Sequence, residues 1–315
     1  MRLGIVSIFI IVTLFGNCLF AQSGTGKRYR IGKNNSIYLP LGKISFADKL
    51  IAYEVGSPSP KQIFRDSTQC LHEPNYTSYS SPDFISLGCG GSLTVQFTDN
   101  GLMNLKGDDI YIFEVAPERE SSKIEVSTNG KDWIYAGKVS GGKSKIDLSD
   151  ENIDSHTVFH YVRVTDLKDL CKSKSAGADI DAIGAINSVI TLTINADLLF
   201  DVDDYSLKDT AEQILDTLVK TIRLVDKATI SLEGHTDNDG NDAYNLELSK
   251  NRCRTVVEKL ITTIGYKTYD YEVIAFGERL PKVPNNSPEN KQINRRVEIK
   301  ILPPKDYFES IREKD

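Results

Sequence analysis

The chain has 315 residues, with 38 Lys and Arg against 44 Asp and Glu, and 40% of its residues are hydrophobic. This is the composition of a folded protein rather than of a disordered, collagen-like or coiled-coil chain. The net charge of -6 gives no broad positive field, which argues against nucleic acid or an anionic membrane surface as the partner. At roughly 100 to 200 residues per domain, we expect two domains.

The N-terminus has the pattern of a secretory signal peptide. Arg2 precedes an uncharged, mostly apolar run over residues 3–20, and we expect cleavage to remove residues 1–21. Cys18 could carry a lipid, but residues 15–17 fit the bacterial lipobox poorly, and this choice stays open. Later stretches fall short of the roughly 18 to 20 apolar residues of a membrane helix. We therefore predict a secreted chain without a transmembrane segment.

Four cysteines remain after the signal peptide: Cys70, Cys89, Cys171 and Cys253. An oxidising compartment permits disulfides, and four cysteines allow three pairings. Cys253 lies within a predicted helix and is typical of a small buried hydrophobic residue. We favour a bond between Cys89 and Cys171 and leave Cys70 unassigned.

After an N-terminal segment (residues 22–43), residues 44–188 show the pattern of an all-β domain. Short runs of β-formers alternate with turn sequences such as Asn100-Gly101 and Asn129-Gly130. Such spacing predicts an antiparallel β-sandwich of jelly-roll type. The predicted strands cover residues 92–97, 109–114, 123–127, 133–136 and 159–164.

The pattern changes near residue 190 to that of an α/β unit. A β run over residues 190–200 precedes two predicted helices at residues 207–224 and 244–264. Strands are expected at 229–233, 271–276 and 296–302. We predict an α/β domain over residues 190–302 with a mixed sheet and two main helices. The charged tail, residues 303–315, is expected to be loosely held.

A polar, glycine-bounded loop over residues 234–240 joins a strand to the second of these helices. It contains Asp237, and the helix carries Asn245, Ser249 and Arg252 at i, i+4 and i+7, on one stripe. Asp237 could bind an ammonium group and Arg252 a carboxylate, which together suit an amino-acid head group. The alternative is that Asp237 caps the helix while Arg252 is solvated or pairs with Asp237.

Six separated motifs in this half resemble the OmpA-like C-terminal domain family, which is shared by OmpA, the peptidoglycan-associated lipoprotein and MotB. The resemblance covers roughly residues 190–302. The motifs are Leu198 to Asp201, Gly234 to Asp237, Tyr244-Asn245, Leu248-Ser249 with Arg252, Phe276 to Glu278 with Pro281, and Asn294 to Ile299.

This resemblance implies non-covalent binding of peptidoglycan, with Asp237 and Arg252 holding the diaminopimelate head group of the stem peptide. It also implies that Thr236, Asn238 and Asn245 line the pocket, and that His235 is structural rather than catalytic. We expect Arg295 and Arg296, which precede Glu298, to form structural ion pairs.

The N-terminal half resembles a β-sandwich module of bacterial secreted proteins, whose ligand the resemblance does not supply. The recurring segments stand at residues 88–92, 109–114, 127–133 and 177–185. Cys89 lies in the first of these segments, and the resemblance implies its pairing with Cys171. Within the module, Asp109, Asp179 and Asp181 could hold Ca²⁺, or be solvated turn residues. Trp133 could stack on a sugar or lie in the core.

We therefore predict a non-enzymatic protein of the periplasm, associated with the outer membrane or cell wall. It would link peptidoglycan to an unknown protein or glycan partner of the β-sandwich. One alternative is a calcium-dependent adhesin or glycan-binding protein that the OmpA-like domain anchors. A less favoured one is a cell-wall hydrolase that uses paired carboxylates such as Glu114 and Asp179. No cofactor is expected beyond the possible Ca²⁺.

Overall fold

The computed structural model describes residues 26–31, 35–78, 80–115, 120–140, 144–169, 171, 176–265 and 268–312. The predicted signal peptide and Cys18 lie outside these residues. Among the described residues, every helix is too short or too polar to cross a membrane.

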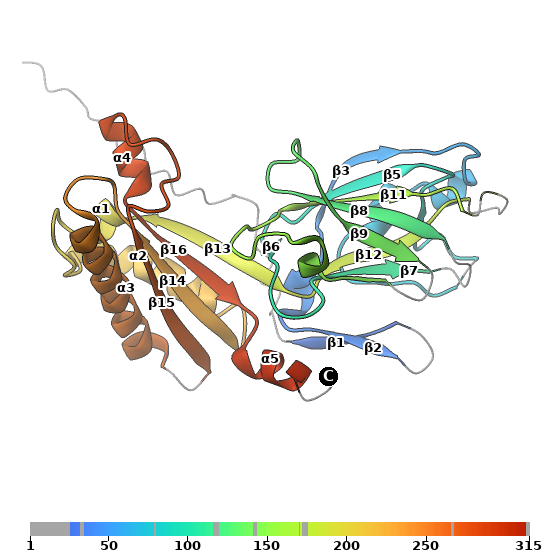
Figure 1. Cartoon of the computed structure of the whole chain (residues 1–315). Coiled ribbons are helices and arrows are strands. Elements are labelled where there is room, and N and C mark those ends of the chain that lie inside the picture. The colour runs from blue at the N-terminus through green and yellow to red at the C-terminus, as the bar shows by residue number, and fades with distance from the viewer. Residues whose placement is uncertain are drawn as a thin grey trace, which may run out of the picture.

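The N-terminal half is built from two antiparallel sheets that share one hydrophobic core (Figure 1). The five-stranded sheet has the order β3-β5-β11-β8-β9, from β3 (Lys49–Glu54), β5 (Ser92–Gln96), β8 (Ser121–Ser127), β9 (Ile134–Ser140) and β11 (Tyr161–Asp166). The four-stranded sheet has the order β10-β7-β12-β4, from β4 (Ile85–Ser86), β7 (Ile110–Glu114), β10 (Lys145–Ile146) and β12 (Asp179–Ala185).

Alternating burial along these strands explains the shared core. In β11, Val162 and Val164 are buried while the residues between them are partly exposed. They join one cluster with Ile112 of β7 and Ile180 of β12, which belong to the other sheet. Period-two alternation thus places one face of the five-stranded sheet against the four-stranded one. The all-β character predicted for residues 44–188 is present, and we call this part the N-terminal β domain.

The C-terminal half is built on a mixed sheet of order β15-β14-β16-β13-β6, in which β6 (Gly101–Leu102) comes from the N-terminal half, with two main helices against one face (Figure 1). Strand β14 pairs parallel with β15 and antiparallel with β16. The helices and strands of this half are β13 (Ser188–Asn195), α1 (Ala196–Leu199), α2 (Glu212–Ile222), β14 (Ala228–His235), α3 (Asp242–Ile264), β15 (Tyr269–Gly277), α4 (Pro288–Asn294) and β16 (Arg296–Leu302).

The core of this half lies between the helices and the sheet. Ile230 and Leu232 of β14 pack in one cluster with Leu218 of α2 and with Cys253 and Leu260 of α3. Burying side chains of this size contributes about 1.5 to 3 kcal/mol each. Cys253 is fully buried and free, as the helical pattern predicted.

Strand β13 connects the two halves. Ser188 and Val189 pair with β6 (Gly101–Leu102), and Ile190–Asn195 then pair with β16. The predicted β run over 190–200 is shorter than expected, because the Asn195 side chain accepts a hydrogen bond from the Asp197 N–H at 2.8 Å and starts α1. Polar capping by Asn ends the strand there.

Two terminal segments pack together on the N-terminal β domain. The hairpin of β1 (Lys27–Arg30) and β2 (Ser36–Leu39) buries Tyr29 against the domain. Helix α5 (Lys305–Arg312) places Tyr307 beside Tyr38 of the hairpin, with 5.9 Å between ring centroids. The expectation of a loosely held tail was therefore wrong for residues 305–312, because Tyr307 packs on the hairpin while Lys305 and Asp306 form ion pairs with Glu272 and Lys227.

Candidate functional site

The loop between β14 and α3 is held by two close backbone approaches. A Cβ on Gly234 would lie 2.4 Å from the Ser249 carbonyl oxygen of α3, so only glycine allows this packing. Gly277, at the end of β15, has φ of +55°, and a Cβ at this position would also clash with the α3 backbone. The Gly277 carbonyl accepts a hydrogen bond from the Thr236 N–H at 2.9 Å. Glycine positions thus fix the loop against the helix.

Asp237 is buried at the start of this loop, with 6% of its surface exposed. One carboxylate oxygen accepts the Asp239 N–H at 3.0 Å, which shapes the loop. The other accepts Nη1 of Arg295 at 2.6 Å. Asp237 does not cap α3, because the Asn241 side chain does so by accepting the Tyr244 N–H. The capping alternative for Asp237 is therefore wrong.

Arg252 lies on α3 and is 5% exposed. Its Nε donates to the Asp204 carbonyl at 2.9 Å and its Nη2 to the Asp201 carbonyl at 3.1 Å. Its guanidinium also stacks over the Phe200 ring at 5.3 Å. Burial lowers the pKa of Arg252, while neighbouring charges such as that of Asp197 raise it. Arg252 is therefore neither a solvated surface charge nor the partner of Asp237.

Arg295 links Asp237 to a second carboxylate. Its Nε and Nη2 donate to the two Asp197 oxygens at 2.8 and 2.7 Å, a bidentate contact, while Nη1 reaches Asp237. Hydrogen bonds with Asp197 raise the pKa of Arg295, so it stays charged. Sequence reasoning placed Arg295 in an ion pair, but Asp197 and Asp237 were missed as its partners, because the three residues come from different elements.

The remaining predicted pocket residues differ in exposure. Thr236 is 3% exposed, and its hydroxyl finds no hydrogen-bond partner among the described residues. Asn245 is 2% exposed and donates from Nδ2 to Glu278 at 2.6 Å and, more weakly, to the Asp237 carbonyl at 3.4 Å. Asn238 is exposed on the loop. The structure thus brings Asn245 next to Asp237 and leaves Asn238 at the surface.

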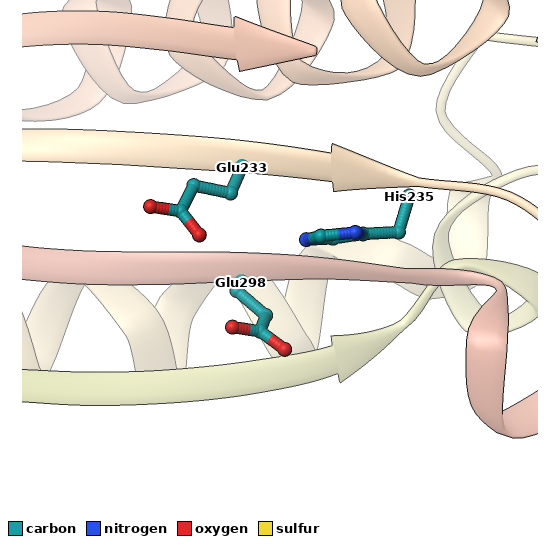
Figure 2. A group of neighbouring side chains, drawn as sticks. All are labelled: Glu233, His235 and Glu298. Carbon is teal, nitrogen blue, oxygen red and sulfur yellow. The ribbon is translucent and has the colours of Figure 1, made fainter. Parts of the chain in front are cut away.

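His235 ends β14 next to the loop, facing Glu233 and Glu298 (Figure 2). These three form the one group of described residues whose ligand-type atoms lie within 4.8 Å of one another. Glu233 is already paired with Lys300 at 2.7 Å, and Glu298 with Arg296 at 2.6 Å. The two basic groups supply the positive charge that a metal ion would bring, so we assign a buried ion-pair network here.

The environment of His235 fits a structural role. The side chain is 3% exposed and stacks on Phe276 with 5.1 Å between ring centroids. Burial, with repulsion from Arg296, lowers the pKa of His235 to about 4. The imidazole is therefore neutral at physiological pH. The expected ion pair of Arg296 is confirmed, and the predicted structural role of His235 agrees with this burial.

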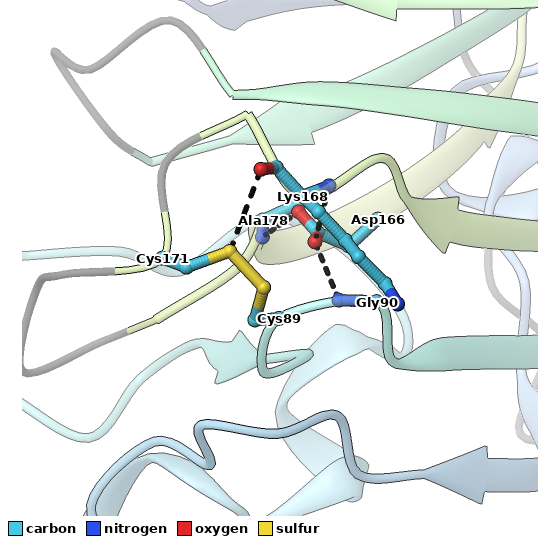
Figure 3. The surroundings of a disulfide bond; sticks show 6 residues. All are labelled: Cys89, Gly90, Asp166, Lys168, Cys171 and Ala178. Carbon is cyan, nitrogen blue, oxygen red and sulfur yellow. Dashed lines mark hydrogen bonds between the residues drawn. A yellow bond between two sulfur atoms is a disulfide. The ribbon is translucent and has the colours of Figure 1, made fainter.

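In the N-terminal β domain, Cys89 and Cys171 form a disulfide with 5.3 Å between their Cα atoms, as predicted (Figure 3). Cys70 is free and buried. Asp166, 3% exposed, organises the backbone around the bond. Its carboxylate accepts N–H groups of Gly90 at 2.7 Å, Lys168 at 3.0 Å and Ala178 at 3.2 Å.

The three aspartates considered for Ca²⁺ are not brought together. Asp179 begins β12, whereas Asp109 lies beyond the other end of this strand, where its carbonyl accepts the Ile186 N–H. Protein donors already occupy the carboxylates: Asp109 accepts the Leu148 N–H at 2.8 Å, and Asp181 accepts the Asn75 N–H at 3.0 Å. Asp179 accepts the Ser86 hydroxyl. The predicted trio is therefore corrected: Asp109 lies away from Asp179 and Asp181, which are both buried on β12.

Trp133 lies on the surface side of the N-terminal β domain rather than in its core. It is partly exposed, and the Arg163 guanidinium lies 4.2 Å from its ring centroid. Arg163 also contacts Glu125 at 2.8 Å. The core alternative for Trp133 is thus wrong, and a cation–π contact occupies one ring face.

The C-terminal half of the chain is similar in sequence to known proteins. The chain is 30% identical to outer membrane porin F of Pseudomonas aeruginosa over 44% of this chain and 39% of the porin. It is 35% identical to outer membrane protein A of Bordetella avium over 35% of this chain and 57% of that protein. It is 29% identical to the peptidoglycan-associated lipoprotein of Pseudomonas putida over 39% of this chain and 74% of that protein.

The chain spans about two fifths of the porin and less than three fifths of outer membrane protein A. Among solved structures, the cell wall anchor of the T6SS from Pseudomonas aeruginosa is 28% identical. The match covers 38% of this chain and 85% of that one, with a TM-score of 0.33. Residues 199–295, which hold Asp237, Arg252 and Arg295, match the OmpA family. The C-terminal half of the chain therefore carries an OmpA family domain.

Proposed function

We propose that the domain at residues 190–302 binds peptidoglycan non-covalently, through the diaminopimelate head group of the stem peptide. One observation carries the proposal: Asp237 and Arg252 are both buried and both lie near the pair of Arg295 and Asp197, yet they are not paired with each other. Relatives named as a peptidoglycan-associated lipoprotein and a peptidoglycan-binding protein support the choice of ligand.

Arg252 is suited to receive an anion. Its guanidinium donates hydrogen bonds to backbone carbonyls, which are neutral, and the described residues give it no carboxylate within ion-pair distance. Its positive charge is thus balanced only from further away, by groups such as Asp197 and Asp203. A ligand carboxylate beside the guanidinium would gain charge-assisted hydrogen bonds.

Asp237 is suited to receive an ammonium group. A carboxylate offers about four acceptor positions, and Asp237 uses two of them for Arg295 and Asp239. Arg295 holds the carboxylate in place, so little conformational freedom is lost on binding. Thr236 and Asn245 lie next to it and would contact the head group, with the exposed Asn238 at the rim.

The wider role follows from the two halves. We propose that the OmpA family domain attaches the protein to the cell wall in the periplasm, near the outer membrane. In this role the chain acts as a non-catalytic linker. The N-terminal β domain, which we take as a jelly-roll-like sandwich over residues 44–188, would present a second binding surface to a protein or glycan.

Co-sedimentation with purified sacculi tests this proposal. The mature chain should pellet, whereas Asp237→Ala and Arg252→Ala should each stay mostly in solution. Removing one partner of a charged hydrogen bond costs about 1.5 to 3 kcal/mol, roughly tenfold or more in affinity. Arg254→Ala and Asp216→Ala, at exposed helix positions, are the matched controls and should pellet like the unmodified chain. Equal pelleting of all variants that melt normally would overturn the proposal.

A further inference from the structure

A cavity of about 520 Å³ lies along one edge of β13, between the two halves of the chain. Its walls are residues 98–100 and His160 of the N-terminal β domain, residues 191–195 of β13, and one side of α2. This volume lies within the range of roughly 300 to 1,000 Å³ typical of ligand pockets. The peptidoglycan site proposed above does not include these residues.

The edge of β13 in this cavity is open. Strand β6 pairs with Ser188 and Val189 alone, whereas Ile190–Asn195 pair with β16 on the opposite edge (Figure 1). No other described strand pairs with these residues. Strand edges of this kind present unpaired N–H and C=O groups, and they bind extended peptides.

Two hydrogen bonds show which residues face the open edge. The Asn187 carbonyl accepts the Met103 N–H at 3.2 Å, on the β6 side, while the Ala196 N–H donates to Arg295 at 2.9 Å, on the β16 side. Backbone groups alternate along an antiparallel strand. Odd-numbered residues therefore face the β6 side, and Thr191 and Thr193 direct their backbone groups into the cavity.

The cavity also contains polar atoms without partners. Asn100 is 3% exposed, and its Oδ1 finds no hydrogen-bond donor among the described residues, although its Nδ2 donates to Ser188 at 2.7 Å. The hydroxyl of Thr191 is buried and unpartnered as well. Each unsatisfied buried group costs about 1 to 3 kcal/mol.

One end of the cavity is acidic. Asp99 is a solvent-accessible residue on the cavity wall, and the Asp48 carboxylate is its charged neighbour. Desolvation and then the Asp48 charge raise the pKa of Asp99 to about 7, and no described basic side chain offsets them. Lys282 also lines the cavity but makes no ion pair with Asp99. Two neighbouring carboxylates without a cation favour a basic ligand group.

We propose that this edge binds an extended polypeptide segment that pairs with the backbone of Thr191 and Thr193 and places a basic side chain beside Asp99. The strand edge accounts for the polypeptide, and the Asp48 and Asp99 pair accounts for the basic residue. The site would join a partner protein to the junction between the N-terminal β domain and the OmpA family domain.

Selection of random ten-residue peptides displayed on phage against the full chain tests this inference. We expect enriched peptides to share β-branched residues and one Lys or Arg, and their synthetic forms to bind in fluorescence anisotropy. Thr217→Trp, which fills the cavity from α2, should weaken binding at least tenfold. Thr262→Trp makes the same change on an exposed face of α3 and should leave binding unchanged.

Two further measurements separate the parts of the inference. Hydrogen exchange at the Thr191 and Thr193 amides should slow when peptide is bound. Asp99→Asn should weaken a Lys-containing peptide about tenfold but not the same peptide with norleucine in place of Lys. Failure to enrich any peptide, or equal binding to Thr217→Trp, would overturn the inference. None of these measurements involves sacculus binding. The peptide-binding inference and the proposed peptidoglycan function can therefore fail independently of each other.

Discussion

Asp237 is joined to Arg295 by an ion pair of 2.6 Å, and it makes no such contact with Arg252. Asp237, on the loop after β14, is thereby tied to the start of β16, while Arg252 is fixed by carbonyls of the segment after α1. The two charges of the proposed clamp are thus positioned separately. They do not neutralise each other, and Asp237 shares the charge of Arg295 with Asp197.

Removal of the Arg295 side chain should weaken peptidoglycan binding, although Arg295 makes no direct contact with the ligand in the proposed site. In Arg295→Ala, Asp237 loses its partner and Asp197 loses a bidentate contact. We expect roughly tenfold weaker retention on sacculi and a loss of about 1 to 3 kcal/mol in unfolding free energy.

Arg295→Lys serves as the conservative control. Lys can form one ion pair but cannot make the bidentate contact with Asp197. Retention on sacculi should therefore recover in part, while the loss of unfolding free energy remains. Unchanged retention in Arg295→Ala, measured below its melting temperature, would show that Arg295 does not position Asp237.

The disulfide should stabilise the N-terminal β domain without affecting the cell-wall site. It closes a sequence separation of 82 residues. Replacing Cys89 and Cys171 by Ser should lower the unfolding free energy of this domain by about 2 to 5 kcal/mol. Trp133 is the single tryptophan of the chain, so its fluorescence reports unfolding of this domain. Loss of sacculus binding in the same variant would contradict the separation of the two roles.

Glu114 should make the N-terminal β domain less stable as pH rises. Burial and the neighbouring Asp179 raise the pKa of Glu114 from 4.5 to about 8, and one of its carboxylate oxygens is buried with no hydrogen-bond partner among the described residues. The folded state thus holds this proton more tightly than the unfolded state. The resulting stabilisation is complete below pH 4.5 and disappears as pH rises to about 8.

Glu114→Gln stays neutral and removes this dependence. Between pH 5 and pH 8, its stability relative to the unmodified chain should therefore rise by about 1 to 3 kcal/mol. Urea unfolding followed by Trp133 fluorescence at both pH values measures the difference. A parallel pH profile for the two proteins would show that Glu114 ionises normally.

Gly234 should be irreplaceable for steric reasons. In Gly234→Ala, the new Cβ would approach the backbone oxygen of Ser249 to 2.4 Å, and we expect a loss of about 1 to 3 kcal/mol. Gly265→Ala is the comparison, because at φ of +85° it has open space around it and incurs only backbone strain. Equal melting of Gly234→Ala and the unmodified chain would contradict the close approach.

Sequence periodicity predicted the long helices and the clear strands of the fold, but it missed the short helices. Helix α3 and strand β16 were predicted within two residues, because their apolar patterns are long or clear. Helices α1 and α4 were missed, since four and seven residues give no periodic signal. Their caps, Asn195 and Ser287, were the available indications. Helix α5 was judged by its charge, although Tyr307 is the residue that packs.

The candidate site shows a similar division. Motif spacing identified Asp237, Arg252 and Asn245; the structure places Asn245 beside the Asp237 carbonyl and holds Arg252 against the carbonyls of Asp201 and Asp204. The Arg295 link to Asp197 depends on elements that are 98 residues apart in sequence, which no local pattern shows. The calcium prediction failed for the same reason: Asp109 and Asp179 lie at opposite ends of paired strands, a separation that only the strand register reveals.

The central claim is that Asp237 and Arg252 together recognise the two charges of a diaminopimelate head group. Calorimetric titration of the mature chain with two stem peptides, one with diaminopimelate and one with Lys at the third position, tests it most directly. Lys lacks the terminal carboxylate, so the unmodified chain should bind the diaminopimelate peptide at least tenfold more tightly, about 1.4 kcal/mol. Arg252→Ala should bind both peptides equally. Equal affinities for the unmodified chain, or a preference that survives in Arg252→Ala, would contradict the account.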